Sequence, residues 1–379
     1  MQDLPALHSR LEPALSQAIS KVVASGSYIR GSEVRTLENE LAYYVGTAYC
    51  RTCANGTEAL QIALMALDLQ PGDEVITTTF SFIAAAEACK LLGLKAVFAD
   101  IDPKTFNIDP QGVERLVTPR TRAIIPVHLF GAMAPMEPII EIARRHNLTI
   151  IEDAAQAFGA EQTVFGKRLK ACAVGHIGCT SFFPTKNLGC MGDGGAVFTN
   201  SADLAEKINI VASHGAERKY HSVRVGINSR LDEIQAAILR IKLRRLDECI
   251  SRRRSAALKY RAALAADDFV VCPAMADGHT FNQFTLHVNY GCRDDLREFL
   301  AQQGISTMIY FPEPIHRQPV FAADLSEAEL ASCPEADKAA ASVLSIPMHS
   351  ELTPDTINRV SDAILRFEIG ANRRAKENK

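Results

Sequence analysis

The most reactive candidate in the sequence is Lys186, which follows the run TSFFP at residues 180–184 and precedes the glycine cluster at residues 192–195. A lone lysine after an aromatic run is normally exposed to solvent and has no functional role. This one falls in a turn between two predicted strands, where partial burial would lower the pKa of its amine from about 10.4. More free amine would then be present to attack an aldehyde carbon.

A second segment offers groups for an anion. Residues 55–60 read NGTEAL and begin a predicted helix. Gly56 allows a ligand to approach the backbone closely, and Thr57 supplies a hydroxyl and an N–H where the helix dipole favours negative charge. The common alternative is an ordinary helix cap made by Asn55 or Thr57.

A third segment, IIEDAAQ at residues 150–156, ends a predicted buried strand in Asp153. A carboxylate at the carboxyl end of such a strand faces the crevice where α/β sheets bind ligands. It could hold a metal, a ribose or a protonated ring nitrogen. A loop-capping aspartate is an equally good interpretation from this segment alone.

The elements that must position these residues alternate between strands and helices, which predicts a mainly parallel sheet covered on both faces. Apolar helix periodicity continues over residues 231–265. Beyond residue 270 the composition changes, and a strand (281–290) and a helix (294–303) predict a smaller α/β domain. We expect a large domain over residues 1–250 and a small one over 251–379. Strands are predicted at 74–77, 96–99, 123–127, 149–152, 180–183 and 196–199, and helices at 57–67, 84–92 and 136–146.

Composition excludes several classes of protein. The chain has 379 residues, 47% of them hydrophobic, with a formal net charge of −3, which is typical of a soluble globular protein. This balance argues against nucleic-acid or membrane binding, and no run reaches the roughly 18 apolar residues of a membrane span. The N-terminus lacks the features of a signal peptide, so we expect a cytoplasmic protein.

Two clusters of residues with reactive or charged side chains do not predict sites. The ten cysteines are expected to be reduced, and Cys50-x2-Cys53 lacks a second ligand pair, so no metal is predicted. Seven basic residues between positions 240 and 254 are interleaved with Asp247 and Glu248. They favour a solvated helix face over a nucleic-acid patch.

Together with HLFG at residues 128–131, NSRLD at 228–232 and IPMH at 346–349, the three segments closely resemble the DegT/DnrJ/EryC1/StrS family of sugar aminotransferases. The resemblance covers about residues 11–366. It implies pyridoxal 5'-phosphate as cofactor and the aspartate-aminotransferase fold (fold type I), a large α/β domain with a mostly parallel seven-stranded sheet and a smaller C-terminal α/β domain. It also implies homodimers whose active sites are shared between subunits.

The resemblance assigns roles to individual residues. Lys186 matches the lysine that bonds the cofactor aldehyde, and Asp153 the carboxylate that pairs with the pyridine nitrogen. Gln156 matches the neighbour of the ring's phenolic oxygen. The remaining cofactor residues it implies are Gly56, Thr57 and Ser181 around the phosphate, Phe82 stacked on the ring, and Asn228 reaching the phosphate from the partner subunit. Because some relatives have His in place of the lysine and dehydrate sugars, Lys186 favours transamination.

The run IGCTSFFP at residues 177–184, with GDGG at 192–195, resembles a branch that aminates carbon 3 of UDP-linked 3-keto sugars. That branch includes enzymes for the 2-acetamido 3-keto uronate, takes glutamate as donor, and serves surface polysaccharide or lipopolysaccharide. A 4-keto hexose, as in perosamine synthesis, is the alternative. Tyr310-Phe311-Pro312 departs from the branch's usual His-Tyr-Pro, and residues 162–176, near the expected site entrance, form a longer stretch than usual.

Candidate substrate contacts are Tyr310, Phe311, His316 and Arg230. Arg230 suits a phosphate or carboxylate, although a salt bridge with Asp232 or Glu233 is the alternative. Two other kinds of protein share the cofactor pattern. One is a regulator that binds the cofactor without turnover, and the other is a lyase or decarboxylase of the same fold.

Overall fold

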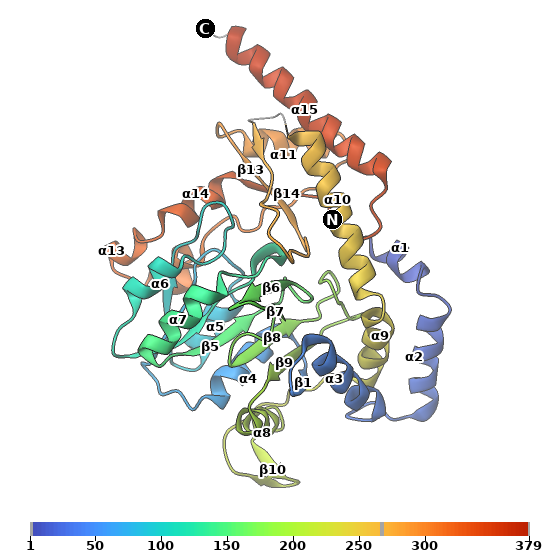
Figure 1. Cartoon of the computed structure of the whole chain (residues 1–379), viewed down its shortest axis with the longest axis vertical. Coiled ribbons are helices and arrows are strands. Elements are labelled where there is room, and N and C mark those ends of the chain that lie inside the picture. Colours follow the sequence, from blue (N-terminus) through green and yellow to red (C-terminus); the bar gives the residue numbers. More distant parts are fainter. Residues whose placement is uncertain (1–2, 266–268, 378–379) are drawn as a thin grey trace.

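The computed structural model describes residues 3–265 and 269–377. Its centre is a seven-stranded sheet in the order β1-β9-β8-β5-β4-β2-β3 (Figure 1). Strand β9 runs antiparallel to both of its neighbours, and the pairs β8–β5, β5–β4, β4–β2 and β2–β3 are parallel. The mostly parallel seven-stranded sheet predicted from the sequence is therefore confirmed. The strands are β1 (Tyr49–Cys53), β2 (Glu74–Thr78), β3 (Lys95–Ala99), β4 (Thr121–Ile125), β5 (Thr149–Asp153), β8 (Ile177–Ser181) and β9 (Gly195–Thr199).

Helices cover both faces of this sheet, because its strands are apolar on both sides. One face packs against α3 (Ser32–Val45), α6 (Pro110–Leu116), α7 (Met136–His146) and α9 (Glu233–Leu243). The other face packs against α4 (Gly56–Ala66), α5 (Ala84–Leu91) and α8 (Ala202–Val211). Successive residues of β5 show the division, since Ile150 packs on the α7 face of the sheet and Ile151 on the α4 face.

A second core forms around a three-stranded antiparallel sheet of β12 (Val270–Val271), β13 (Phe284–Val288) and β14 (Val343–Ile346). Helices α10 (Leu246–Leu264), α11 (Arg293–Gln302) and α15 (Pro354–Glu377) surround it (Figure 1). Helix α10 supplies Leu246 and Ile250 to the core of the large sheet, and Ala256 and Tyr260 to the second core. A domain boundary at residue 250 stays a prediction.

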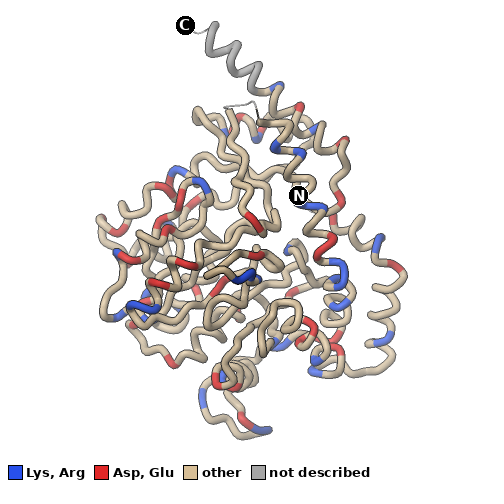
Figure 2. Tube along the Cα trace, in the orientation of Figure 1, with Lys and Arg blue, Asp and Glu red and all other residues tan. Residues whose placement is uncertain are grey.

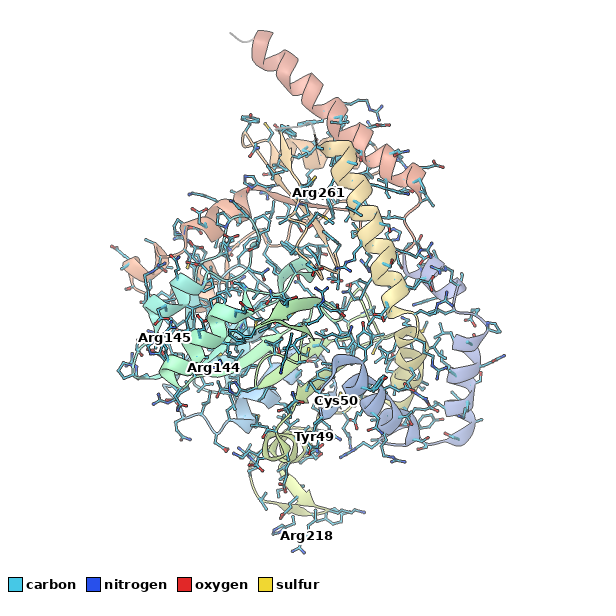
Figure 3. The ribbon with its side chains drawn as sticks, in the orientation of Figure 1. Tyr49, Cys50, Arg144, Arg145, Arg218 and Arg261 are labelled. Carbon is cyan, nitrogen blue, oxygen red and sulfur yellow. The ribbon has the colours of Figure 1, made fainter. Side chains whose placement is uncertain are left out.

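Several elements lie outside the two sheets. The N-terminal helices α1 (Leu4–Ser9) and α2 (Ala14–Ser25) lie beside α9, as Figure 1 shows. The stretch at residues 162–176 contains most of a hairpin of β6 (Glu161–Val164) and β7 (Lys167–Lys170). A second hairpin, β10 (Ala216–Arg218) with β11 (His221–Ser222), projects from the body with Arg218 on it (Figure 3). Smaller helices are η1 (Leu129–Gly131), η2 (Ile315–Arg317), α12 (Pro319–Ala322), α13 (Glu327–Leu330) and α14 (Pro334–Ser342).

The predicted surface character of the basic cluster was partly wrong. Acidic and basic residues are interspersed along the chain (Figure 2), and Arg240 pairs with Glu33 and Glu40. Lys242 and Arg253, however, are only 7% and 4% exposed. Arg253 donates to the carbonyls of residues 281, 282 and 348, and thus ties α10 to the second core. Charge pattern alone could not reveal this, because the acceptors are backbone carbonyls.

The cysteines form no disulfide, and Cys53 is fully buried on β1, the strand that also carries Cys50 (Figure 3). Within residues 3–265 and 269–377, no three His, Cys, Asp or Glu side chains group as metal ligands. Over the same residues, none of the helices combines the length and apolar character that crossing a bilayer requires.

Candidate active site

A cavity of about 360 Å³ opens at the carboxyl ends of the parallel strands, where α/β sheets bind ligands. Nine of the residues predicted from the sequence line it, and they come from distant segments of the chain. These are Gly56, Thr57, Phe82, Asp153, Gln156, Ser181, Lys186, Tyr310 and Phe311.

The first turn of α4 forms one wall of the cavity. Asn55 caps this helix by accepting from the N–H of Glu58 at 2.8 Å. A Cβ atom on Gly56 would lie 2.6 Å from Cβ of Ser181, so only glycine allows this close approach to β8. Among the hydrogen bonds of the described residues, none uses the N–H of Gly56 or Thr57. Two donors at a helix N-terminus are therefore free to bind an anion.

Asp153 ends β5 and is 6% exposed. Its Oδ1 accepts from the N–H of Ala155 at 3.0 Å. Burial raises the pKa of the Asp153 carboxyl, against the opposing effects of that hydrogen bond and of the Lys186 charge. A buried carboxylate of this kind stabilises a cation placed against it.

Gln156 lies on the same loop and is also 6% exposed. Its Oε1 accepts from the N–H of Phe130 at 2.8 Å. This bond fixes the carboxamide and leaves its NH₂ group as the donor available to the cavity.

Lys186 follows β8 in a turn whose backbone is tied by the bond from the Lys186 N–H to the Phe183 carbonyl at 2.9 Å. Burial lowers the pKa of the Lys186 amine, and the charge of Asp153 opposes this shift. The direction is the one that the sequence predicted. A neutral amine at this position can act as a nucleophile or accept a proton.

Aromatic side chains close the other sides of the cavity. Phe82 lines it and is 59% exposed, which leaves a ring face available for stacking. Tyr310 and Phe311 enter from the C-terminal part of the chain, and Phe311 packs edge-on against the buried Phe80. Burial raises the pKa of the Tyr310 hydroxyl, so this group is a neutral hydrogen-bonding partner.

Three predicted residues do not line the cavity. His316 is fully buried, and its Nδ1 lies 2.6 Å from Oγ1 of Thr79, so its placement gives no support to a substrate contact. Asn228 and Arg230 are exposed on either side of the buried Ser229. Within the described residues Arg230 makes no ion pair, and Glu233 instead binds the N–H groups of residues 33 and 34.

Ten lining residues were not predicted as site residues, and the polar ones among them include Ser81, Thr185, Asp193 and Gln283. Asp193 lies within the glycine cluster at residues 192–195, and this cluster could have indicated a site residue. No local motif marks Gln283, because its position at the cavity depends on how the C-terminal part folds back over the large sheet. The β6–β7 hairpin, expected near the site entrance, does not contribute to the lining.

Comparison with known proteins identifies the family. Residues 10–365 match the family described as the DegT/DnrJ/EryC1/StrS aminotransferase family. The chain belongs to this family. A "Pleiotropic regulatory protein" of Geobacillus stearothermophilus is 47% identical to this aminotransferase over 97% of the chain and 98% of the relative. The UDP-2-acetamido-2-deoxy-3-oxo-D-glucuronate aminotransferase of Pseudomonas aeruginosa is 44% identical over 96% and 98%.

Among solved structures, that of S. venezuelae DesV in complex with a ketimine intermediate superposes with a TM-score of 0.91. It shares 38% identity and covers 96% of this chain and 97% of its own. The predicted fold type I is thereby confirmed. The predicted cofactor, pyridoxal 5'-phosphate, is also confirmed.

The cavity of this aminotransferase fits that cofactor. The close approach at Gly56 and the two free N–H groups suit a phosphate. The buried Asp153 carboxylate suits a protonated ring nitrogen. Lys186, with its lowered amine pKa, suits the aldehyde.

Proposed function

We propose that this protein transfers the amino group of glutamate to carbon 3 of a UDP-linked 2-acetamido 3-keto sugar or its uronate. The product would supply amino sugars for surface polysaccharide or lipopolysaccharide, made in the cytoplasm. The observation that carries the proposal is the 44% identity, over nearly the whole of both chains, to an aminotransferase named for such a uronate.

Lys186 has two roles in this proposal. Its amine would hold the cofactor between turnovers, and the free amine would then accept and return a proton at Nζ. Positioned proton transfer of this kind contributes about 10²–10⁴-fold to rate. The lowered pKa of the amine serves both roles, because each requires the neutral form.

Asp153 keeps the ring nitrogen protonated. The bound cofactor supplies an electron sink for the cleaved C–H bond, and it does so best with that nitrogen charged. The N–H groups of Gly56 and Thr57 and the hydroxyl of Ser181 would bind the phosphate. Phe82 would stack on the ring, and the Gln156 NH₂ would donate to its phenolic oxygen.

The charges of the cavity support a shared site in a homodimer. Among the lining residues described, Lys186 is the only Lys or Arg, whereas Asp153 and Asp193 are both acidic. Glutamate and a nucleotide sugar are both anionic and need further cations. Arg230 is exposed and makes no ion pair within the described chain, and Asn228, two residues before it, is also exposed. We assign both to the partner's cavity, with Tyr310 and Phe311 as contacts to the sugar nucleotide.

Product analysis tests this function. The purified holoenzyme is incubated with glutamate and a panel of UDP-3-keto, dTDP-3-keto and GDP-4-keto sugars. We expect equimolar 2-oxoglutarate and 3-amino sugar from the UDP-3-keto substrate. Amination of only the GDP-4-keto sugar would favour the perosamine-type alternative. A product formed with loss of a carboxyl group, or without 2-oxoglutarate, would indicate a lyase or decarboxylase. No amine product from any of the keto sugars would favour a regulatory protein without turnover.

A second candidate, a regulatory protein that binds the cofactor without turnover, has support in the name of the 47% identical relative. Retention of Lys186 and Asp153 argues against it, because a protein without turnover needs neither proton transfer nor an electron sink. Borohydride reduction and peptide mapping locate the bonded lysine. We expect the Lys186 peptide to be labelled, and labelling of another peptide would refute the assignment.

A further inference from the structure

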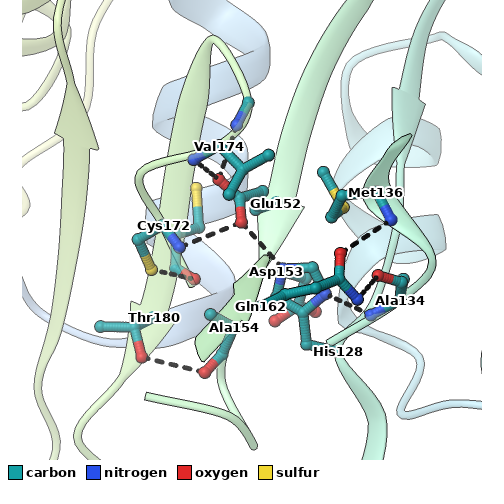
Figure 4. A network of polar contacts seen from close by, with 12 residues as sticks. His128, Ala134, Met136, Glu152, Asp153, Ala154, Gln162, Cys172, Val174 and Thr180 are labelled. Carbon is teal, nitrogen blue, oxygen red and sulfur yellow. Dashed lines mark hydrogen bonds and ion pairs between the residues drawn. The ribbon is translucent and has the colours of Figure 1, made fainter. Parts of the chain in front are cut away.

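Directly behind the cavity, β5 turns its other side to a buried polar cluster centred on His128 and Glu152 (Figure 4). Both side chains are fully buried, and His128 Nε2 lies 2.8 Å from Glu152 Oε2. His128 begins the HLFG segment, to which neither the cofactor nor the proposed substrate contacts give a role.

The hydrogen bonds of His128 fix its tautomer. The N–H of Ala134 donates to Nδ1 at 3.1 Å, so Nδ1 carries a lone pair and no proton. The proton is therefore on Nε2 and points to Glu152. The contact is a hydrogen bond from a neutral imidazole to a carboxylate. In an imidazolium, the proton on Nδ1 would point at the N–H of Ala134, and neither group could accept it.

Glu152 uses all four of its acceptor positions. Its Oε1 accepts from the N–H groups of Val174 and Gly175, both at 2.7 Å. Its Oε2 accepts from the N–H of Cys172 at 3.1 Å and from His128. A buried carboxylate with four donors is compensated for its lost hydration. It joins the loop at residues 172–175, β5 and the His128 turn.

The His128 turn in turn holds two cofactor residues. The N–H of His128 donates to the carbonyl of Asp153 at 2.9 Å, and the N–H of Asp153 donates to Pro126 at 3.0 Å. Two residues beyond His128, the N–H of Phe130 binds the Gln156 carboxamide at 2.8 Å. The imidazole thus anchors the turn that sets the backbone of Asp153 and the orientation of Gln156.

We propose that His128, in its Nε2–H form, is a positioning residue that acts through Glu152 to hold Asp153 and Gln156 against the pyridine ring. The inference rests on the proposed roles of those two residues. A shift of about 1 Å in a reacting group can reduce rate about 10²-fold, so a buried anchor at this point bears on turnover as well as on stability.

The first experiment reads the tautomer of the wild-type imidazole and needs no cofactor. ¹⁵N-histidine labelling of the wild-type apoprotein reports the tautomer of each imidazole, and His128→Gln identifies the His128 signals by their loss. We expect the neutral Nε2–H signature. An Nδ1–H tautomer or an imidazolium would overturn the proposal.

The second experiment compares His128→Leu, which removes both ring bonds, with His128→Gln, whose NH₂ can still donate to Glu152. For His128→Leu we expect kcat to fall about 10- to 100-fold with a much smaller change in KM for glutamate. The pH midpoint of the bound cofactor's visible absorbance should also move. His128→Gln should recover most of both properties. Wild-type values in a folded His128→Leu variant would overturn the proposal.

Gln162 provides the matched control. It binds the same turn, donating to the carbonyl of Ala134 at 3.1 Å and accepting from the N–H of Met136 at 3.2 Å (Figure 4), and it has no hydrogen bond to Asp153 or Gln156 among the described residues. Gln162→Ala should lower the melting temperature and leave the absorbance midpoint unchanged. An equal spectral shift in this variant would refute specific positioning by His128. If Asp153→Asn itself has no effect on turnover, the proposed role of Asp153 fails, and not the link through His128.

Discussion

Gly56→Ala is the smallest change that tests how the phosphate is bound. The added Cβ would lie 2.6 Å from Cβ of Ser181 and 3.2 Å from its Cα, against 3.4–4 Å for ordinary contact. Restoring 3.4 Å requires the first turn of α4 and the end of β8 to separate by at least about 0.8 Å (3.4 − 2.6). Neither side yields easily, because the Ser181 contacts include backbone.

A separation of that size lengthens an ordinary 2.9 Å hydrogen bond to well beyond 3.5 Å, so it removes at least one bond from Gly56, Thr57 or Ser181 to the phosphate. Hydrogen bonds to a charged group contribute about 1.5–3 kcal/mol. The dissociation constant for pyridoxal 5'-phosphate should therefore rise about 10- to 150-fold.

Titration of the apoprotein with the cofactor, followed by absorbance, measures this constant directly. Gly112→Ala is the matched control, since Gly112 also lies in the first turn of a helix, and its nearest neighbour is the far end of the Asp109 side chain at 3.3 Å. The control should bind the cofactor as the wild type does. A wild-type dissociation constant in folded Gly56→Ala would refute the assignment of this turn to the phosphate.

Three further predictions concern charge and assembly. Asp153→Asn should retain the cofactor but lose about 10²-fold or more in kcat, because the charge opposite the ring nitrogen is gone; full activity would exclude that role. Mixing Lys186→Ala with Asn228→Ala subunits should restore about a quarter of wild-type activity, because half of random dimers are mixed and each has one intact site. No recovery would count against shared sites. For Lys242, burial lowers the pKa to about 8, so between pH 8 and the ordinary lysine pKa of 10.5 the unfolded chain holds a proton that the folded chain has released. The free energy of unfolding of the wild type, relative to that of Lys242→Met, should therefore increase by about 3 kcal/mol across this pH window. Urea unfolding at both ends of the window measures this difference, and a pH-independent difference would contradict the prediction.

Much of the large sheet could be predicted because its strands are short apolar runs separated by amphipathic helices. The errors have local physical causes. Strand β4 ends at Ile125, before the predicted end, because Pro126 has no N–H for the ladder. Strand β8 begins at Ile177, three residues before the predicted start. The prediction missed this start because Gly178 interrupts the apolar pattern. That glycine is required where the backbone of Cys172 passes, since a Cβ would lie 2.4 Å from its Cα.

The candidate site divides in the same way. Gly56, Asp153 and Lys186 belong to contiguous motifs whose residue types indicate a chemistry, so the sequence was sufficient to find them. Gln283 and Tyr310 reach the cavity only because the C-terminal part folds back over the sheet. His316, near Tyr310 in the sequence, packs instead beside Thr79 in the core, and its burial likewise depends on how the C-terminal part folds back.

The pair Glu152-Asp153 shows what one strand register decides. Adjacent residues of a strand point to opposite faces, so one of these two carboxylates must face the cavity and the other the opposite core. Ile150 and Ile151 decide which, because they pack in the α7 and α4 cores respectively and so place Asp153 on the α4 side with the free N–H groups. A shift of one residue would put Glu152 in the cavity and leave Asp153 among the donors of Cys172, Val174 and Gly175. Its side chain is one methylene shorter than the four hydrogen bonds of Glu152 require. The apolar residues of β5 therefore determine that Asp153 faces the cavity, and the four hydrogen bonds of Glu152 on the opposite side stabilise this register.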